Sequence, residues 1–397
     1  MRIIGPVSVM VDTESAEVRE AVQALFALLL DAGAWVNPHL RIVERAGQIS
    51  VWSEADDPWL IRIPRQTLVP VTDINWSDEP PLRVEGASSS LTAQQRDVLN
   101  ACVDVMAANH TWEHFRATHP RATITDPEAI AIIQSLHPAF SPATDAAAMI
   151  KTRTIKMSMD DAEPQSYLMP MLDLVNHHPA APAYTWDDGF LCIPTWRAVP
   201  GGECFVSYGS IRDVLGMALA YGYVDENITR ANALSGEYSI PGGGTLRLMR
   251  ASRPTSTNGH AHDQDSLTII GAASDESDPA VQRQTLLEPI EWHLRDHGMP
   301  ALQARHQARV LARRIWASDD LRQRQALAAL KDLSGCDLVS RAIQLQLQHL
   351  GWLTPLKARE ASRHPCPISF AAQLDAPPRA IPFPSPATSS RRTAHPS

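Results

Sequence analysis

Side chains able to take part in chemistry gather in two short segments of this sequence. The first is YLMPMLDLVNHHP, residues 167–179, and the second is VPGGECFVSYG, residues 199–209, with LAYGYVDEN behind it at 219–227. The amide and imidazole of Asn176-His177 follow one apolar run, and the phenol of Tyr208 follows another. Such residues are also common at strand ends that have no chemical role. Their occurrence in this order, with strand-like sequence between them, favours a functional site.

The histidines permit a metal site as an alternative. His110 and His114 are four residues apart, which places both on one face of a helix, and His177-His178 would complete the ligands. However, the order H-E-x-x-H is absent, no nearby carboxylate is an obvious base, and a chain with 15 histidines contains such pairs by chance. We therefore expect no bound metal and keep a metalloenzyme as the weaker alternative.

The two segments resemble the active centre of SET-domain protein methyltransferases, specifically the branch that includes the Rubisco large-subunit methyltransferases and their actin-histidine relatives. In that family an apolar strand leads to D-x-x-N-H, and G-E-x-x-x-S-Y-G and Y-G-F/Y-V follow. The resemblance is close over about 146–232 and faint over about 37–64. The matching residues are Asp173, Asn176-His177, Gly202-Glu203, Ser207-Tyr208-Gly209 and Tyr221-Gly222-Tyr223-Val224.

This resemblance implies S-adenosylmethionine (SAM) as the cofactor and methylation of a protein nitrogen, of lysine first and histidine second. In-line transfer needs the methyl group and an uncharged nitrogen to be held collinear, so positioning supplies most of the catalysis. The resemblance gives Tyr208 the catalytic role, and makes Tyr221 and Tyr223 walls of a dry target channel that disfavours the lysine ammonium. It assigns cofactor contacts to Asn176, His177, Arg153, Gly47 and Tyr208.

One part of the family pattern is altered in this chain. A G-x-G turn normally precedes an apolar-proline pair by about seventeen residues, and counting back from Ile63-Pro64 reaches Arg45-Ala46-Gly47. Only the second glycine is kept, and a side chain at the first position is expected to crowd the backbone against the cofactor. The family's G-E is Asp57-Pro58 here. A SET-fold protein that binds SAM or a peptide without turnover is therefore the alternative function.

The spacing of apolar residues predicts the elements that position these groups. Residues 17–32 have helical spacing, and residues 35–64 form short alternating runs of strand type. The segment 91–150 is predicted to be helical, with Thr92 and Asp126 as caps and prolines as breaks. Strand-like runs return at 166–208, so a helical block is expected to interrupt two β-rich regions.

The fold class is therefore predicted to be α+β. The resemblance implies a SET β-fold with a pseudoknot, in which the Asn-His strand passes through a surrounding loop. The helical period of residues 281–353 predicts an all-helical C-terminal domain, which in the family docks the substrate protein. The expected parts are a SET domain at 1–240 with a helical insertion at about 91–150, a loop or linker at 241–280, the helical domain at 281–362 and a disordered tail at 363–397.

Composition limits the partners. The net charge of −9 disfavours nucleic acid, because phosphate binding requires clustered Lys and Arg. The five cysteines are scattered and form no C-x-x-C pair, so neither a disulfide framework nor a thiolate zinc cluster is expected. No segment is long and apolar enough to span a membrane, and the N-terminus reaches Asp12 before any long apolar run, unlike a signal peptide. We expect a cytoplasmic monomer whose partner is a protein substrate.

Overall fold

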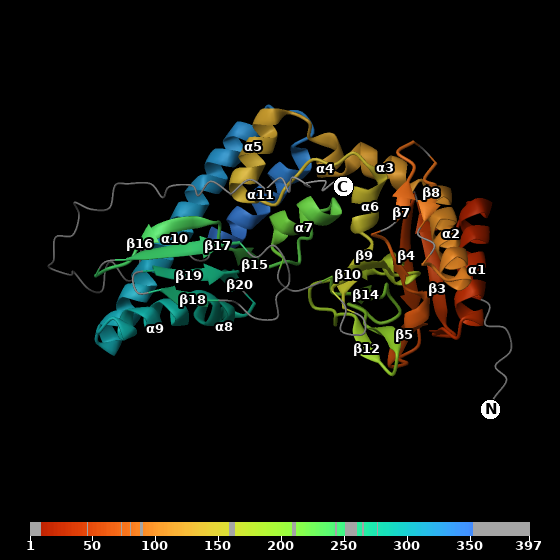
Figure 1. Cartoon of the computed structure of the whole chain (residues 1–397), viewed down its shortest axis with the longest axis horizontal. Coiled ribbons are helices and arrows are strands. Elements are labelled where there is room, and N and C mark those ends of the chain that lie inside the picture. Colours follow the sequence, from red (N-terminus) through yellow and green to blue (C-terminus); the bar gives the residue numbers. More distant parts are fainter. Residues whose placement is uncertain are drawn as a thin grey trace, which may run out of the picture. The chain divides into compact units, whose positions relative to one another are not determined.

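The computed structural model describes residues 9–351, apart from 46, 73, 80, 88–89, 159–162, 209–211, 243, 251–259, 264–265 and 276. These residues form two compact units, each assembled from separate stretches of the chain (Figure 1). Unit 1 contains the described residues of 1–131, 140–229 and 329–346, and unit 2 those of 132–139, 230–328 and 347–351. The predicted tail at 363–397 lies outside the described residues, as do Ala46 and Gly209.

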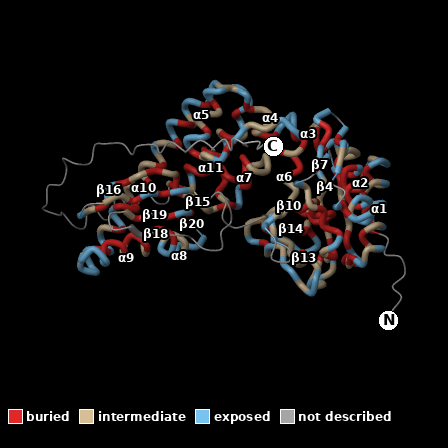
Figure 2. The backbone as a smooth tube through the Cα atoms, in the orientation of Figure 1, coloured by how far each residue is buried: buried red, intermediate tan, exposed pale blue. Residues whose placement is uncertain are grey.

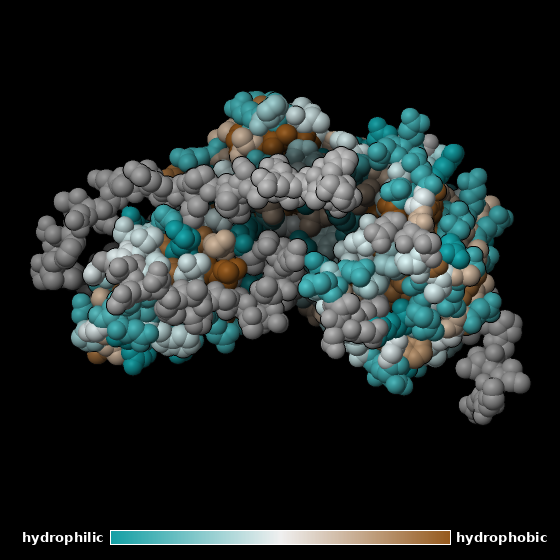
Figure 3. All heavy atoms as spheres, in the orientation of Figure 1, coloured by the Kyte–Doolittle hydropathy of each residue, from teal (hydrophilic) through white to brown (hydrophobic). Residues whose placement is uncertain are grey.

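Two amphipathic helices, α1 (Ala16–Asp31) and α2 (Ala93–Ala108), pack side by side in unit 1 (Figure 1). The predicted cap Thr92 is confirmed: its hydroxyl accepts from the N–H of Gln95, whose side chain accepts from the N–H of Thr92. Both helices bury an apolar face, and the outward side of α1 is mainly hydrophilic (Figure 3).

The remaining helices between residues 111 and 151 are short. The predicted break at Pro120 is confirmed, since this residue opens a helix, and the predicted break at Pro138 follows the end of the next helix at Leu136. Pro127, which was not predicted as a break, opens that next helix. The Asp126 carboxylate accepts from the N–H of Glu128 at 2.7 Å, as a cap should. The helices are α3 (Thr111–Thr118), α4 (Pro120–Thr123), α5 (Pro127–Leu136) and α6 (Ala146–Lys151).

The sheets of unit 1 are small and meet at one apolar core. One sheet has the strand order β1-β3-β4, in which β1 runs parallel to β3 and β3 runs antiparallel to β4. A second sheet is antiparallel and has the order β12-β13-β5-β2. Their alternating residues meet in the core, where Ile42, Val51 and Ile61 are fully buried (Figure 2). The strands are β1 (Met10–Asp12), β2 (Trp35–Val36), β3 (Leu40–Arg45), β4 (Gln48–Ser53), β5 (Trp59–Pro64), β12 (Thr185–Asp187) and β13 (Phe190–Pro194).

Shorter pairings complete unit 1. They are β6-β10-β9, β7-β8 and the parallel pair β11-β14. The threaded crossing of the Asn-His strand stays a prediction. The strands are β6 (Val69–Pro70), β7 (Ile74–Trp76), β8 (Val84–Ala87), β9 (Thr154–Met157), β10 (Gln165–Leu168), β11 (Asn176–His177) and β14 (Phe205–Val206), and the helices are η1 (Arg65–Thr67), η2 (Leu172–Leu174) and α7 (Val214–Tyr221). Helix α11 (Asp337–Gly351) belongs to unit 1 as far as Gln346.

Unit 2 contains strands where the sequence predicted a linker at 241–280, so that prediction is wrong. The runs TLRLM and SLTII alternate polar and apolar residues and bury Leu246, Leu248, Leu267 and Ile269. The polar sequence between these runs, residues 250–265, concealed the alternation. One sheet has the order β16-β17-β19-β18, and β15 pairs with β20; the strands are β15 (Arg230–Asn232), β16 (Gly236–Ser239), β17 (Thr245–Met249), β18 (His260–Asp263), β19 (Ser266–Ile270) and β20 (Ala273–Asp275).

The helices predicted for residues 281–353 are present as far as Gly351, but a separate all-helical domain is not confirmed, because unit 2 combines helices with the strands that follow Arg230 in one helix-on-sheet unit. Ala308, Leu311 and Ile315 line one face of its longest helix and share an apolar core with the sheet. That helix has 30 residues, but among the described residues no helix combines the length and apolarity needed to cross a membrane. The helical elements are α8 (Pro279–Gln282), a π-helical turn η3 (Arg283–Leu287), α9 (Glu288–Asp296) and α10 (Ala301–Leu330).

A buried carboxyl group links α10 to the start of this sheet. Asp319 is fully buried, and its Oδ2 accepts from the backbone N–H of Leu234 at 2.9 Å. Its Oδ1 is buried and has no hydrogen-bond partner among the described residues. Burial raises the pKa of Asp319 to about 7, because a carboxylate is poorly solvated there.

We predict that Asp319 makes the stability of unit 2 fall as the pH rises from about 4 to 7. Over this range the folded chain holds a proton that an unfolded Asp, with a pKa near ~3.9, has already lost. The loss is at most roughly 4 kcal/mol, and Asp319→Asn should remove it. Urea unfolding at several pH values measures the difference between the two proteins. Asp296→Asn, at an exposed position of α9, is the control and should follow the wild type; an unchanged slope in Asp319→Asn would contradict the prediction.

Candidate active site

The two sequence segments meet through the parallel pairing of β11 with β14. Asn176 is opposite Phe205 and His177 is opposite Val206. On its other side this second segment contacts β4, since the N–H of Cys204 donates to the carbonyl of Val51 at 2.7 Å. Both Cys204 and Val206 are fully buried, so apolar burial holds the segment between β4 and β11.

Asn176 presents an exposed side chain at this junction. Its Nδ2 donates to Oε1 of Glu203 at 2.6 Å and to the carbonyl of Ile49 at 3.2 Å. No described residue donates to its Oδ1. The amide therefore uses its donors inside the protein and keeps its acceptor available.

His177 is held by contacts at both ring nitrogens. Its Nδ1 accepts from the backbone N–H of Tyr208 at 2.9 Å, so the ring proton belongs on Nε2. The Nε2 atom lies 3.7 Å from Oδ2 of Asp225, whose side chain is buried. Burial lowers the pKa of His177, although Asp225 opposes that shift, and the imidazole is therefore neutral at physiological pH. The sequence interpretation did not single out Asp225.

The predicted catalytic residue Tyr208 lies beside His177. Its hydroxyl donates to the carbonyl of Val175 at 2.8 Å, and its ring centroid is 5.1 Å from that of His177 and 4.9 Å from that of Tyr221. Burial raises the pKa of Tyr208, so the phenol is neutral and cannot serve as a phenolate base at physiological pH.

Helix α7 carries Tyr221, its last residue, to this cluster, and Gly222 caps the helix. Gly222 has φ 77°, and a Cβ there would lie 2.7 Å from Cδ2 of the buried His119, so both the backbone conformation and the available space require glycine. Burial lowers the pKa of His119 to about 4 and keeps this packed ring neutral. The reversal after Gly222 directs the chain to Tyr223 and Asp225.

Tyr223 brings a buried hydroxyl that meets no hydrogen-bond partner among the described residues. Burial raises its pKa, with Tyr208 and Asp225 adding to the shift, which places all three groups in one neighbourhood. A buried hydroxyl without a partner is costly, so a ligand group or an ordered water that bonds to it would be stabilised.

A further tyrosine, Tyr184, joins the cluster and was missed from the sequence. The parallel bridge between Ala183 and Ser207 places Tyr184 next to Tyr208 along paired segments. Burial raises the pKa of Tyr184 well above its usual value, with Tyr208, Asp173 and other tyrosines contributing. The only sequence signal for Tyr184 was its position after the Pro179–Pro182 turn, and a turn does not indicate that Tyr184 contacts Tyr208.

Arg153 is paired with the first residue of the D-x-x-N-H motif. Its Nη1 donates to Oδ2 of Asp173 at 3.2 Å, and the Asp173 side chain is almost fully buried. Burial raises the pKa of Asp173, and the guanidinium of Arg153 opposes this shift. The expected cofactor contact of Arg153 stays a prediction.

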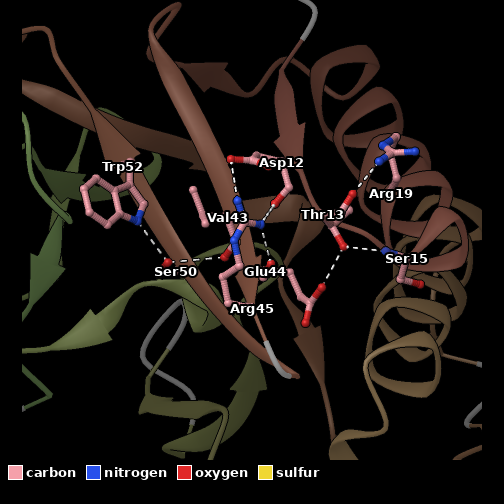
Figure 4. Close-up of polar contacts among 9 residues, drawn as sticks. All are labelled: Asp12, Thr13, Ser15, Arg19, Val43, Glu44, Arg45, Ser50 and Trp52. Atoms are coloured by element: carbon pink, nitrogen blue, oxygen red, sulfur yellow. Dashed lines mark hydrogen bonds and ion pairs between the residues drawn. The ribbon is translucent and has the colours of Figure 1, made fainter.

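The turn at Gly47 makes its own contacts. The N–H of Gly47 donates to Oε1 of Glu44 at 2.7 Å, and its carbonyl accepts from Nδ2 of Asn109 at 3.0 Å. Figure 4 shows Arg45 directed toward Asp12 of β1, and their ion pair spans 2.9 Å. The Arg45 side chain, which replaces the first glycine, thus extends toward β1, whereas Asn176 contacts Ile49 of β4. The direction of the Arg45 side chain does not support the expected crowding of the backbone against the cofactor. A cofactor contact by Gly47 stays a prediction.

The histidines of the metal alternative lie on different elements. His110 and His114 are at the start of α3, and His177-His178 belong to β11 and the residue after it. Within the part of the chain that the structure describes, no three or more His, Cys, Asp or Glu side chains are arranged to hold a metal ion. The metalloenzyme therefore has no support from the described geometry.

Comparison with known proteins gives structural similarity alone. No protein-family profile and no curated protein matches the chain. It is similar to the SET domain of LSMT bound to lysine and AdoHcy, with 12% identity over 87% of this chain and 92% of that one and a TM-score of 0.41. Rubisco LSMT bound to AdoMet gives 11% identity, 86% and 92% coverage and a TM-score of 0.42. Rubisco LSMT bound to sinefungin and monomethyllysine has 13% identity over 86% of this chain and 92% of that one, with a TM-score of 0.41. At these scores the similarity assigns no role to any residue here.

We predict that Asp225→Asn destabilises unit 1 by about 1–3 kcal/mol. Oδ1 of Asp225 accepts from the N–H and Nδ2 of Asn227, so an amide that keeps these bonds turns its N–H₂ toward Nε2–H of His177 and leaves two donors facing each other. The control is Asp187→Asn, which breaks the partly exposed pair with Arg62 and should cost at most ~1 kcal/mol. Chemical denaturation of both variants gives the comparison. Equal losses in the two proteins would show that Asp225 has no special part in holding His177.

Proposed function

We propose that this chain is a SAM-dependent methyltransferase that modifies a nitrogen of a protein side chain, lysine first and histidine second. The observation that carries the proposal is the gathering of Tyr184, Tyr221 and Tyr223 around Tyr208, whose ring lies beside that of His177. The unpartnered hydroxyl of Tyr223 supports it further, because a neutral amine entering the cluster would provide the missing hydrogen-bond partner. The motif resemblance points to the same chemistry.

The residues around Asn176 fit the cofactor. The exposed amide of Asn176 has an unused oxygen that could accept a hydrogen bond from the α-ammonium group of SAM. The neutral imidazole of His177 is compatible with an uncharged ring of the cofactor beside it. When bound, SAM supplies a methyl group activated by its sulfonium. The peptide groups of Gly47 fit less well, because its N–H is already bonded to Glu44.

The chain's own groups would act by positioning and by excluding water. Tyr208 is neutral and its hydroxyl hydrogen is directed to Val175, so its oxygen lone pairs are left to orient the target nitrogen and to accept weak C–H contacts. This arrangement would favour one direction of approach of the target nitrogen to the methyl group. Groups held in position in this way lower the barrier to methyl transfer.

Charged groups of both signs lie near the cluster, the guanidinium of Arg212 and the buried carboxyl group of Asp225. The guanidinium of Arg212 lies 5.2 Å from the ring centroid of Tyr221, and a second cation entering there would be repelled. Desolvation by the tyrosines disfavours the ammonium form of lysine in the same direction. Both effects would lower the pKa of the entering amine, whereas Asp225 would raise it. The proposal therefore requires desolvation and Arg212 to outweigh Asp225, so that the amine leaves its proton in the solvent before reaction.

The geometry at Gly47 also favours a second candidate function, a protein that binds SAM or a peptide without turnover. Glu44 and Asn109 already bond both peptide groups that a G-x-G turn would offer, so cofactor affinity would depend mainly on the Asn176 side. The two functions differ in turnover, which the following experiment measures.

We predict that Tyr208→Phe lowers methyl transfer by ~10²-fold or more while SAM affinity stays within a few-fold of wild type. Loss of the bond to the Val175 carbonyl should cost only about 1 kcal/mol of stability. The assay incubates purified protein and labelled SAM with a lysate of its own cells, and mass spectrometry identifies the labelled proteins. Calorimetry measures SAM binding.

The matched control is Tyr167→Phe, a buried tyrosine of β10 on the strand that pairs with β9 and β6. It should retain turnover. Equal activity of wild type and Tyr208→Phe would remove Tyr208 from the mechanism. If all three proteins bind SAM and none of them shows turnover, the second candidate function is favoured.

A further inference from the structure

Glu203 is held in place from both directions along the chain. It follows the tight turn Pro200-Gly201-Gly202, where a Cβ on Gly202 would lie 2.8 Å from Cγ2 and 3.0 Å from the carbonyl oxygen of Val199. Beyond it, the N–H of Cys204 donates to Val51, and Glu203 itself forms a β-bridge with Trp52. Its carboxylate therefore reaches Asn176 from a defined backbone position rather than from a free surface loop.

The contacts of Asn176 leave its amide only one orientation. Both groups that face Nδ2, the carboxylate of Glu203 and the carbonyl of Ile49, can accept hydrogen bonds but cannot donate them. Turning the amide over would direct Oδ1 at two acceptors and lose two hydrogen bonds, one of them charge-assisted. Oδ1 is therefore held on the opposite side, where no described residue donates to it.

We propose that Glu203 is a positioning residue: it fixes the Asn176 amide so that Oδ1 is presented to the bound ligand as an acceptor for an ammonium group. This inference rests on the proposed function and assigns the ammonium to the amino-acid end of SAM. Removing the charge of Glu203 while keeping its shape should release the constraint, because a glutamine can turn its own N–H₂ toward Asn176 and stabilise the inverted amide.

Calorimetry with two probes separates orientation from simple support of the fold. S-adenosylhomocysteine carries the amino-acid end, whereas methylthioadenosine lacks it and keeps the adenosine. Glu203→Gln should weaken S-adenosylhomocysteine binding by about 10-fold and leave methylthioadenosine within about 2-fold of wild type. The control Glu237→Gln, which removes the charge from an exposed pair with Arg247 in unit 2, should change neither affinity.

A double-mutant cycle tests whether Glu203 acts through Asn176. In an Asn176→Ala background, Glu203→Gln should have no further effect on S-adenosylhomocysteine affinity, because the amide that it orients is gone. The thermal melting of each variant reports whether it is folded. The single variant Asn176→Ala and the double variant both lack the hydrogen bond between residues 176 and 203, so their affinities can be compared directly.

The outcomes are distinct. Selective loss of S-adenosylhomocysteine affinity that disappears in the Asn176→Ala background supports the positioning role. Equal weakening of both probes, or full affinity in Glu203→Gln, would overturn it while leaving the proposed function in place. Absence of S-adenosylhomocysteine binding to the wild-type protein would overturn the proposed function and the role of Glu203 together.

Discussion

The parallel pairing of Asn176-His177 with Phe205-Val206 is the contact on which the candidate site depends. Two-residue strands are too short to hold each other in water, so their pairing requires burial of the residues around them. Val175, Cys204 and Val206 supply it, since all three are fully buried. Once the two segments are joined, the Tyr208 N–H meets His177, the Tyr208 hydroxyl meets Val175, and Asn176 meets Glu203.

Burial around this pairing also sets the electrostatic character of the site. It raises the pKa values of Tyr184, Tyr208 and Tyr223 and lowers that of His177, so these groups remain neutral hydrogen-bonding partners at physiological pH. The carboxylate of Asp173 is paired with Arg153 instead of facing the tyrosines alone. A cluster of neutral side chains in fixed positions would suit the proposed reaction, which needs an uncharged nitrogen and correct geometry more than it needs a strong acid or base.

The fold was predictable where the hydrophobic period extended over many residues. Helices α1, α2 and α10 occupy segments with helical spacing, and the Thr92 cap marked the start of α2. The sheet of unit 2 was missed because strands of three to five residues, such as Thr245–Met249, show too few alternations to stand out from Gly- and Ser-rich surroundings. Assignment of 329–346 to unit 1 depends on contacts between distant residues, which no local pattern encodes.

The sequence by itself determined which residue types are available and in what order: an Asn-His pair, a Tyr after an apolar run, and further tyrosines behind a short helix. The tertiary structure decided which of them meet. It placed Tyr184 beside Tyr208, Asp225 beside His177 and Glu203 against Asn176, and it turned Arg45 toward β1. The physical reason is that periodicity and turn residues report local backbone preference, whereas a hydrogen-bond partner some thirty residues away is chosen by packing.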